Sequence, residues 1–393
     1  MEYIIVILFL LYGIINYDIR YRKNIKFEYT ILFFMFFLSA FQYHIGADIF
    51  AYEYEYNQGY FINSIQDLYS QSDNRRQPGW VLLIWICNRI NDNFIFFKVI
   101  QALFVNYSIY RLVKYLRLPI YMSLLMYFLF LYPNLNFNTL RQSFSIAIFA
   151  FAIPYLESRK LINYYVCCVC AFMFHNSAFI LFIFPLFILI KNIGKRYVYS
   201  IVACLIILYF LFSTMNANNL LISFLGNLNL GNNIEELGVS YLENENYQRE
   251  RGLKVFIHLT IWLIPFVYYI KQKSKQDKNT VLSKPLFLFL YMMSVIFCFL
   301  DSFVPIFYRL NLFVVMIYYG YTSYMIIDLI QKKSFVICVL SIILYLLYPL
   351  TSYFHKSPIS GNRLIDQYYP WHSIFTKQTE KHRELQFNKY KIK

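Results

Sequence analysis

Residues 118–156 read LPIYMSLLMYFLFLYPNLNFNTLRQSFSIAIFAFAIPYL, two apolar runs separated by a short polar stretch. A full bilayer crossing takes about 20 residues, and fewer suffice where the bilayer thins or the helix is buried in a bundle. The polar stretch includes an arginine, Arg141, at the start of the second run. We therefore expect two membrane helices joined by a polar turn, and similar apolar runs recur along the chain.

The composition of the whole chain favours a membrane protein. Of its 393 residues, 59% are hydrophobic and 15% are charged, whereas an average soluble protein is about 25% charged. So apolar a chain has too little polar surface for a soluble globule and too much apolar surface to remain disordered. All seven cysteines lie in apolar runs without metal-ligand spacing, which favours packing residues over a disulfide scaffold.

The apolar runs predict twelve crossings. The stretch 161–190 is too long for one comfortable crossing and is broken at His175-Asn176-Ser177, which indicates two short helices. We expect an all-α polytopic membrane protein, with residues 1–354 as a single integral-membrane domain and 355–393 as a basic C-terminal tail. The other ten runs are 3–17, 28–43, 93–111, 118–133, 141–156, 197–213, 253–270, 284–300, 306–328 and 334–352.

Lysine and arginine predict the orientation, because basic loops stay in the cytoplasm. With an outside N-terminus, six inner loops carry nineteen of these residues and the outer segments carry six. Helix parity places the tail after residue 354 outside, although it carries eight more. Most of the net charge of +15 thus comes from residues on the cytoplasmic side, where they face anionic lipid. The sequence has no nucleic-acid-binding motif, so the charge does not indicate nucleic-acid binding. The inner loops are 20–26, 111–117, 159–160, 191–196, 271–284 and 332–333.

Two outer segments are long, residues 44–78 and 214–252. Long loops without structure of their own are uncommon unless they serve a function, so we expect the chemistry on this outer side. Residues 79–90 are apolar but too short to span a bilayer. They favour a half-inserted or interfacial helix.

Two arginines stand at the outer ends of apolar runs. The planar guanidinium of Arg141 suits bidentate contact with phosphate, and the alternative is an interfacial side chain reaching to lipid headgroups. Its polar neighbours, Asn138 and Gln142 among them, favour the phosphate interpretation. Arg309 lies about one turn into a later run, where it either binds phosphate too or pairs with Asp301 or an outer-loop acid.

Other polar residues of the outer side each have two interpretations. His175 is a general base or phosphate donor, or else a hydrogen-bonded turn residue. Asp48, close to Gly46, is a base for an attacking hydroxyl or a salt-bridge partner of an arginine. Glu53 and Glu55 are spaced like a metal-binding pair, but we expect solvated charges and no metal site. Aromatic residues interleaved with them suit sugar stacking and an interfacial belt equally well, namely Tyr52, Tyr54, Tyr56 and Tyr60.

The sequence has no P-loop, no dinucleotide-binding glycine pattern and no nucleophile elbow. A nucleotide-driven pump or enzyme is therefore unsupported, and we expect no cofactor. Any reaction must draw on a bond that is already activated in the substrate.

The order of several short motifs resembles the EpsG family, a Wzy-like group of exopolysaccharide and O-antigen polymerases. The resemblance runs in order from about residue 40 to 375, and two positions depart from the family pattern, Ala47 and Gln77. The motifs are Gly46-Ala47-Asp48 with Tyr52, Pro78-Gly79, Phe137-Asn138 with Arg141-Gln142, Phe174-His175-Asn176-Ser177-Ala178, Arg309 with Asn311, and Tyr369-Pro370-Trp371-His372-Ser373-Ile374-Phe375.

This resemblance implies a GT-C-like glycosyltransferase of the bacterial plasma (inner) membrane, with its active site on the periplasmic or extracellular face. Donor and acceptor would be oligosaccharides on undecaprenyl diphosphate, for O-antigen, capsule or exopolysaccharide. A chain-length regulator protein is a candidate partner. Arg141 and Arg309 would stabilise the leaving diphosphate, and Asp48 or His175 would take the acceptor proton. The expected substrate contacts are Tyr52, Arg75, Arg76, Asn138, Gln142 and Asp301.

Two other functions remain open at this point. A flippase or exporter of lipid-linked oligosaccharides would need a basic cavity open to both sides, whereas the candidate charges gather in the outer half. An O-antigen ligase would use the same donor with a different acceptor, which the sequence does not identify.

Overall fold

The computed structural model describes residues 2–72, 76–189, 207, 261–268, 284–301, 306–355 and 363–384. The chain forms two compact units. The first unit comprises Met1–Ile183 with Ile326–Lys393, and the second comprises Phe184–Met325. The expected outer loop 214–252 and, apart from Ile207, the expected crossing 197–213 lie outside the described residues.

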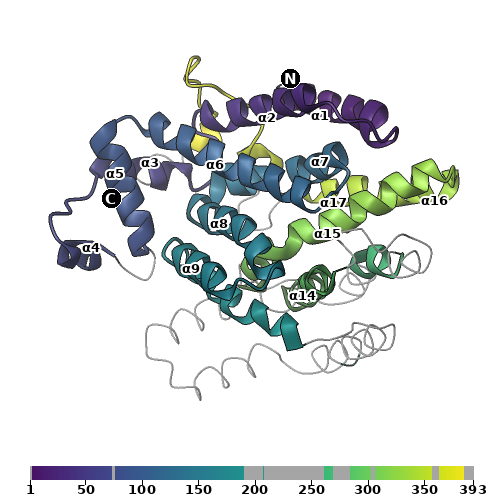
Figure 1. The fold of residues 1–393 in the computed structure, drawn as a ribbon. Helices are drawn as coiled ribbons and strands as arrows, with labels where there is room; N and C mark the ends of the chain where they lie inside the picture. The colour runs from purple at the N-terminus through teal and green to yellow at the C-terminus, as the bar shows by residue number, and fades with distance from the viewer. Residues whose placement is uncertain are drawn as a thin grey trace. The chain divides into compact units, whose positions relative to one another are not determined.

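Each apolar run expected in the first 172 residues forms a helix in the first unit (Figure 1). Local signals set their ends: Asn24 accepts a hydrogen bond from the Phe27 backbone at the start of α2, and Pro119 immediately precedes α7. The helices are α1 (Glu2–Gly13, continued by a π-helical turn at Ile14–Asp18), α2 (Ile25–Ala40), α6 (Phe94–Tyr115), α7 (Ile120–Phe130), α8 (Leu140–Glu157) and α9 (Leu161–Phe172).

The expected outer loop 44–78 has more structure than its sequence indicated. It contains α3 (Ile49–Gln58) and α4 (Ile65–Gln71), and α5 (Pro78–Ile90) follows it directly. A capping box between Ser64 and Asp67 starts α4, and proline occupies the first turn of α5. The break expected within 161–190 is present, because α9 ends at Phe172 and a 3₁₀ helix runs over Asn176–Leu189.

The second unit is also helical in its described part. It holds residues 261–268, α14 (Pro285–Asp301) and most of α15 (Ile306–Gln331). Trp262 stacks on Tyr318 with 3.9 Å between ring centroids, and Ser294 donates a hydrogen bond to Asn311 at 2.9 Å. Aromatic stacking and a buried hydrogen bond thus contribute to the packing of these helices.

Two helices within the described residues are long and apolar enough to cross a membrane, Phe307–Gln331 and Val336–Tyr353. The first is 83% buried and would suit a soluble core as well, but the second is only 17% buried. The second contains α16 (Phe335–Ile342), a π-helical turn (Ile343–Leu347), α17 (Tyr348–Leu350) and a 3₁₀ turn (Thr351–Tyr353). Its exposed side chains include Val336, Leu340 and Leu347.

Water would penalise such a continuous apolar face, whereas lipid would not. The outer faces of α1 and α9 are apolar in the same way, with Leu8 58% and Ile162 80% exposed. The chain is therefore a helical membrane protein, and the number of twelve crossings stays a prediction.

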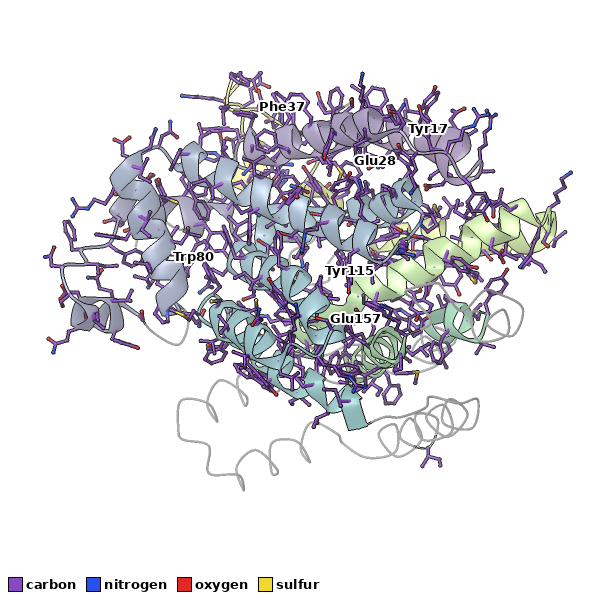
Figure 2. All side chains as sticks on the ribbon, viewed as in Figure 1. Tyr17, Glu28, Phe37, Trp80, Tyr115 and Glu157 are labelled. Atoms are coloured by element: carbon purple, nitrogen blue, oxygen red, sulfur yellow. The ribbon has the colours of Figure 1, made fainter. Side chains whose placement is uncertain are left out.

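Buried charges at the expected inner ends of the helices are paired. Glu28 is 2% exposed, accepts a hydrogen bond from the Tyr110 hydroxyl at 2.5 Å, and forms an ion pair with Lys114 at 3.3 Å. The Tyr115 hydroxyl donates to Glu157 at 2.9 Å and so ties α6 to α8 (Figure 2). These contacts fix one end of α2, α6 and α8, and the polar turn before α8 lies at the other end.

Candidate functional site

Two of the sequence motifs meet where the chain leaves α2. Gly46 has a φ of +101°, and a Cβ there would stand 2.6 Å from the carbonyl oxygen of Phe137. The backbone N–H of Ala47 donates to Asn138 Oδ1 at 2.8 Å. Only glycine tolerates both this conformation and this approach, so Gly46 lets the loop pack directly on the turn before α8.

The next two motifs meet in the same manner. The backbone N–H of Gly79, in the first turn of α5, donates to the carbonyl oxygen of Met173 at 2.8 Å. A Cβ on Gly79 would lie 2.7 Å from that oxygen. Pro78-Gly79 therefore brings the start of α5 against the end of α9, one residue before Phe174-His175.

Arg141 stands in the first turn of α8, beside an aromatic ring. Its guanidinium carbon lies 5.9 Å from the ring centroid of Tyr52. Tyr52 is 6% exposed and packs edge-on against Trp80, with 5.4 Å between ring centroids. Figure 2 shows Trp80 on α5. The Nε atom of Arg141 is buried without a hydrogen-bond partner among the described residues. An aromatic face thus orients Arg141 without neutralising its charge.

Asp48 stands at the start of α3, four residues before Tyr52. Burial raises the pKa of the Tyr52 phenol, the positive charge of Arg141 opposes that rise, and the negative charge of Asp48 adds to it. Both charged groups therefore lie close enough to act on the same phenol. Asp48 is exposed, and its side chain makes no capping hydrogen bond at the start of α3.

A chain of hydrogen bonds links the Arg141-Gln142 motif to His175. Gln142 is 1% exposed and donates through Nε2 to the Ser177 hydroxyl at 3.2 Å. The Ser177 oxygen lies 2.7 Å from His175 Nδ1, and the Ser177 backbone N–H donates to the same nitrogen at 3.1 Å. The turn between α9 and the 3₁₀ helix thereby holds the imidazole from one side.

This arrangement selects one tautomer of His175. A ring nitrogen that accepts a backbone N–H carries no proton, so the Ser177 hydroxyl must donate to Nδ1 as well. Its oxygen then accepts from Gln142, which agrees with the observed bond. In the neutral imidazole the proton resides on Nε2. That tautomer is a hydrogen-bond donor at Nε2.

A buried lysine braces the turn that precedes Arg141, and sequence reasoning missed it. Lys98 of α6 is 1% exposed and donates to the carbonyl oxygen of Asn136 at 2.6 Å and to Gln101 Oε1 at 2.8 Å. Gln101 in turn donates to the carbonyl oxygen of Leu135 at 3.1 Å. The π-helical turn Asn134–Asn138 has carbonyl groups that need such partners. The available signal was a lone lysine within the apolar run 93–111.

Replacing Lys98 by methionine should destabilise the protein, because the side chain keeps its length but both acceptors lose the ammonium. Each buried acceptor left unsatisfied costs about 1–3 kcal/mol. The measurement is the unfolding temperature of the purified protein in detergent, followed by tryptophan fluorescence. Lys160→Met, at an exposed position in the expected inner loop 159–160, is the control. Equal unfolding temperatures for the two variants would show that the brace contributes nothing.

The expectation that Glu53 and Glu55 are solvated charges is wrong for Glu55. Its side chain is 10% exposed and its Oε1 lies 3.2 Å from Arg76 Nε. The same oxygen accepts hydrogen bonds from Trp80 at 3.0 Å and from Tyr60. Glu53 instead pairs with His44 at 3.1 Å. Within the described part of the chain, no three metal-ligating side chains gather.

Several expected substrate contacts are occupied by the protein itself. Tyr52 is 6% exposed and its ring lies against Arg141, and its contact with a sugar stays a prediction. Gln142 is buried and donates a hydrogen bond to Ser177. The side-chain amide of Asn138 accepts a hydrogen bond from Ala47 and donates one to Tyr368. Arg76 is held by Glu55, while Arg75 lies outside the described residues. In this conformation these side chains shape the site.

The second arginine motif belongs to the second unit. Arg309 is exposed on α15, and Asp301 is the last residue of α14 and half-buried. Asn311, two residues after Arg309, is buried and accepts a hydrogen bond from Ser294. A site that combines Arg309 with Arg141 stays a prediction.

Comparison with known proteins agrees with the motif order. The model of the EpsG family matches residues 25–373, which includes the motifs described above apart from the last two residues of the final one, Ile374 and Phe375. No curated protein matches the chain, and no solved structure matches it. Because the match covers most of the chain, this helical membrane protein belongs to the EpsG family and has the exopolysaccharide polymerase-like character of that family.

Proposed function

We propose that the protein is a Wzy-type polysaccharide polymerase. It joins oligosaccharide repeat units carried on a polyprenyl diphosphate, at the outer face of the bacterial plasma membrane. The observation that carries this proposal is the environment of Arg141. This half-buried cation lies over the ring of Tyr52, and its buried Nε has no hydrogen-bond partner among the described residues. A cation held in this way suits an anionic ligand.

The chemistry follows from the donor. The acceptor hydroxyl attacks the anomeric carbon, its proton passes to a base, and the bond from that carbon to the diphosphate oxygen breaks. The electron pair leaves with the polyprenyl diphosphate, whose negative charge grows in the transition state. Arg141 stabilises that growing charge more strongly than it stabilises the ground state, which lowers the barrier.

The two candidate bases, Asp48 and His175, have different roles in this proposal. Asp48 is the proton acceptor, because its carboxylate is exposed and lies near Tyr52 and Arg141. His175 is a donor, because Ser177 holds Nδ1 as an acceptor and leaves the proton on Nε2. An N–H donor suits a diphosphate oxygen better than it suits an acceptor hydroxyl that must lose its proton.

The length of lipid-linked glycan in a strain that lacks the protein tests this function. Accumulated single repeat units that return to long chains on complementation support a polymerase. Trapping of repeat units on the cytoplasmic side would mean a flippase, and long chains left unattached to their final acceptor would mean a ligase. Either of these last two results overturns the proposal.

The proposed outer location of the site makes a separate prediction about labelling. A cysteine at Ser70, exposed on α4, and one at Ser240 should react with an impermeant thiol reagent added to intact cells. A cysteine at Lys275 should react only after permeabilisation, because it lies in the expected basic inner loop. Ser240 and Lys275 lie outside the described residues. The parent chain, with its native cysteines, is the control, and labelling of position 275 in intact cells would reverse the topology.

A further inference from the structure

The C-terminal segment 363–384 pairs with the residues that follow α2. The Tyr43 N–H donates to the carbonyl oxygen of His372 at 2.8 Å, and the Ile374 N–H donates to that of Phe41 at 3.0 Å. Gln42 and Ser373 face each other in this antiparallel bridge, and both are buried. The tail is thus joined backbone to backbone to the start of the first expected outer loop.

Buried side chains hold the segment in this shape. Arg383 is 1% exposed, and its guanidinium donates to the carbonyl oxygens of Asp366 and Pro370, at 3.1 Å in each case. Trp371 Nε1 donates to the carbonyl oxygen of Leu38 at 3.1 Å, near the end of α2. A buried guanidinium is stable only when its donors are satisfied, so these bonds disfavour other conformations of the segment.

The segment also contacts the candidate site. The Gly46 N–H donates to the carbonyl oxygen of Gln367 at 3.0 Å, and Asn138 Nδ2 donates to the Tyr368 hydroxyl. Because Asn138 Oδ1 accepts from Ala47, the amide is fixed at both ends. Asn138 ends the π-helical turn and lies three residues before Arg141. The orientation of that turn therefore depends on Tyr368.

We propose that residues 363–384 form a fixed wall of the candidate site, on the same side of the membrane as residues 41–48. Tyr368 is a positioning residue that acts through Asn138 on the start of α8. The role in turnover rests on the proposed polymerase function, whereas the docking and the side of the membrane do not. Arg383, one of the eight basic residues after residue 354, is buried and donates to internal carbonyl groups.

A disulfide tests the docking without any need for activity. In an antiparallel pair flanked by hydrogen bonds, as Gln42 and Ser373 are, the two Cα atoms lie about 4.5 Å apart. That separation is within the range of a disulfide bond. The variant Gln42→Cys/Ser373→Cys should lose two reactive thiols on mild oxidation, counted by maleimide mass tags after denaturation. Gln42→Cys/Ser158→Cys, which joins opposite ends of the first unit, should lose none. Full retention of thiols in the first variant, when each single variant inserts normally, overturns the docking.

Labelling tests the side of the membrane. A cysteine at Lys381, exposed in the segment, should react with an impermeant reagent in intact cells as readily as one at Ser70. Reaction only after permeabilisation would place the tail inside and overturn the proposal, even if the strain comparison had already established a polymerase.

Kinetics test the positioning role. Tyr368→Phe keeps the ring but removes the acceptor of Asn138, so kcat should fall about 3- to 10-fold, the worth of one hydrogen bond, with KM nearly unchanged. Asn138→Ala combined with Tyr368→Phe should be no slower than Asn138→Ala alone. Additive losses would show that Tyr368 does not act through Asn138. Equal disulfide yield in a Tyr368→Phe background verifies that the segment remains docked.

Discussion

Arg141→Ala should abolish polymerisation while the protein still inserts and folds. In the alanine variant nothing at the start of α8 stabilises the charge that develops on the leaving diphosphate. Arg141→Lys should also be poor, because an ammonium cannot reproduce a planar two-donor fork over Tyr52. The measurement is the chain length of lipid-linked glycan in a deletion strain that expresses each variant at equal level.

The chain provides a matched control for this substitution. Arg89 on α5 is exposed, and its guanidinium carbon also lies 5.9 Å from an aromatic centroid, that of Trp85. Arg89→Ala removes the same kind of contact outside the cluster of motifs and should leave chain length near normal. Normal chain length with Arg141→Lys would mean that the site needs only a positive charge at its rim.

Asp48→Asn should lower turnover by roughly 10²–10⁴-fold, the usual worth of a general base. The amide keeps the shape of the carboxylate and removes its basicity. His175 should behave differently, because its Nε2 proton makes it a donor. His175→Gln, whose amide N–H can take the place of Nε2–H, should retain more activity than His175→Ala. Single-turnover transfer by purified protein with a defined lipid-linked repeat unit is the measurement.

Three outcomes of this comparison are informative. An inactive His175→Gln variant beside a nearly normal Asp48→Asn variant would exchange the two roles. If both variants stayed active, neither residue would be the base, and an oxygen of the leaving diphosphate would take the proton. Equal and complete loss for Gln and Ala at position 175 would exclude a role limited to donation.

Apolar runs and the polar residues that interrupt them were sufficient to predict most helices of the first unit. The run 141–156 and the break at His175 correspond to α8 and to the turn after α9, because hydrophobic length and polar interruption act locally. The order of motifs likewise predicted the family. The order of motifs did not show which side chains contact other parts of the protein.

That distinction depends on contacts between residues far apart in sequence. The hydrogen bond from Gln142 to Ser177 joins the start of α8 to the turn after α9, across 35 residues of sequence. Glu55 was expected to be solvated because it lies in a long outer segment, yet Trp80 and Arg76 bind its carboxylate. Lys98 was missed because the turn that it braces is 38 residues away. No local pattern encodes such pairings.

The bond between Asn138 and Tyr368 also constrains when the protein becomes competent. These residues are 230 positions apart, and Tyr3 at the other terminus donates to the carbonyl oxygen of Tyr368 across 365 positions. Chains are synthesised from the N-terminus, and their early segments begin to fold first. The helix that carries Arg141 and the turn that carries His175 are therefore made before the segment that holds Asn138. On the proposed function, a nascent chain is inserted but inactive until residues 363–384 have been made, which takes on the order of seconds of synthesis.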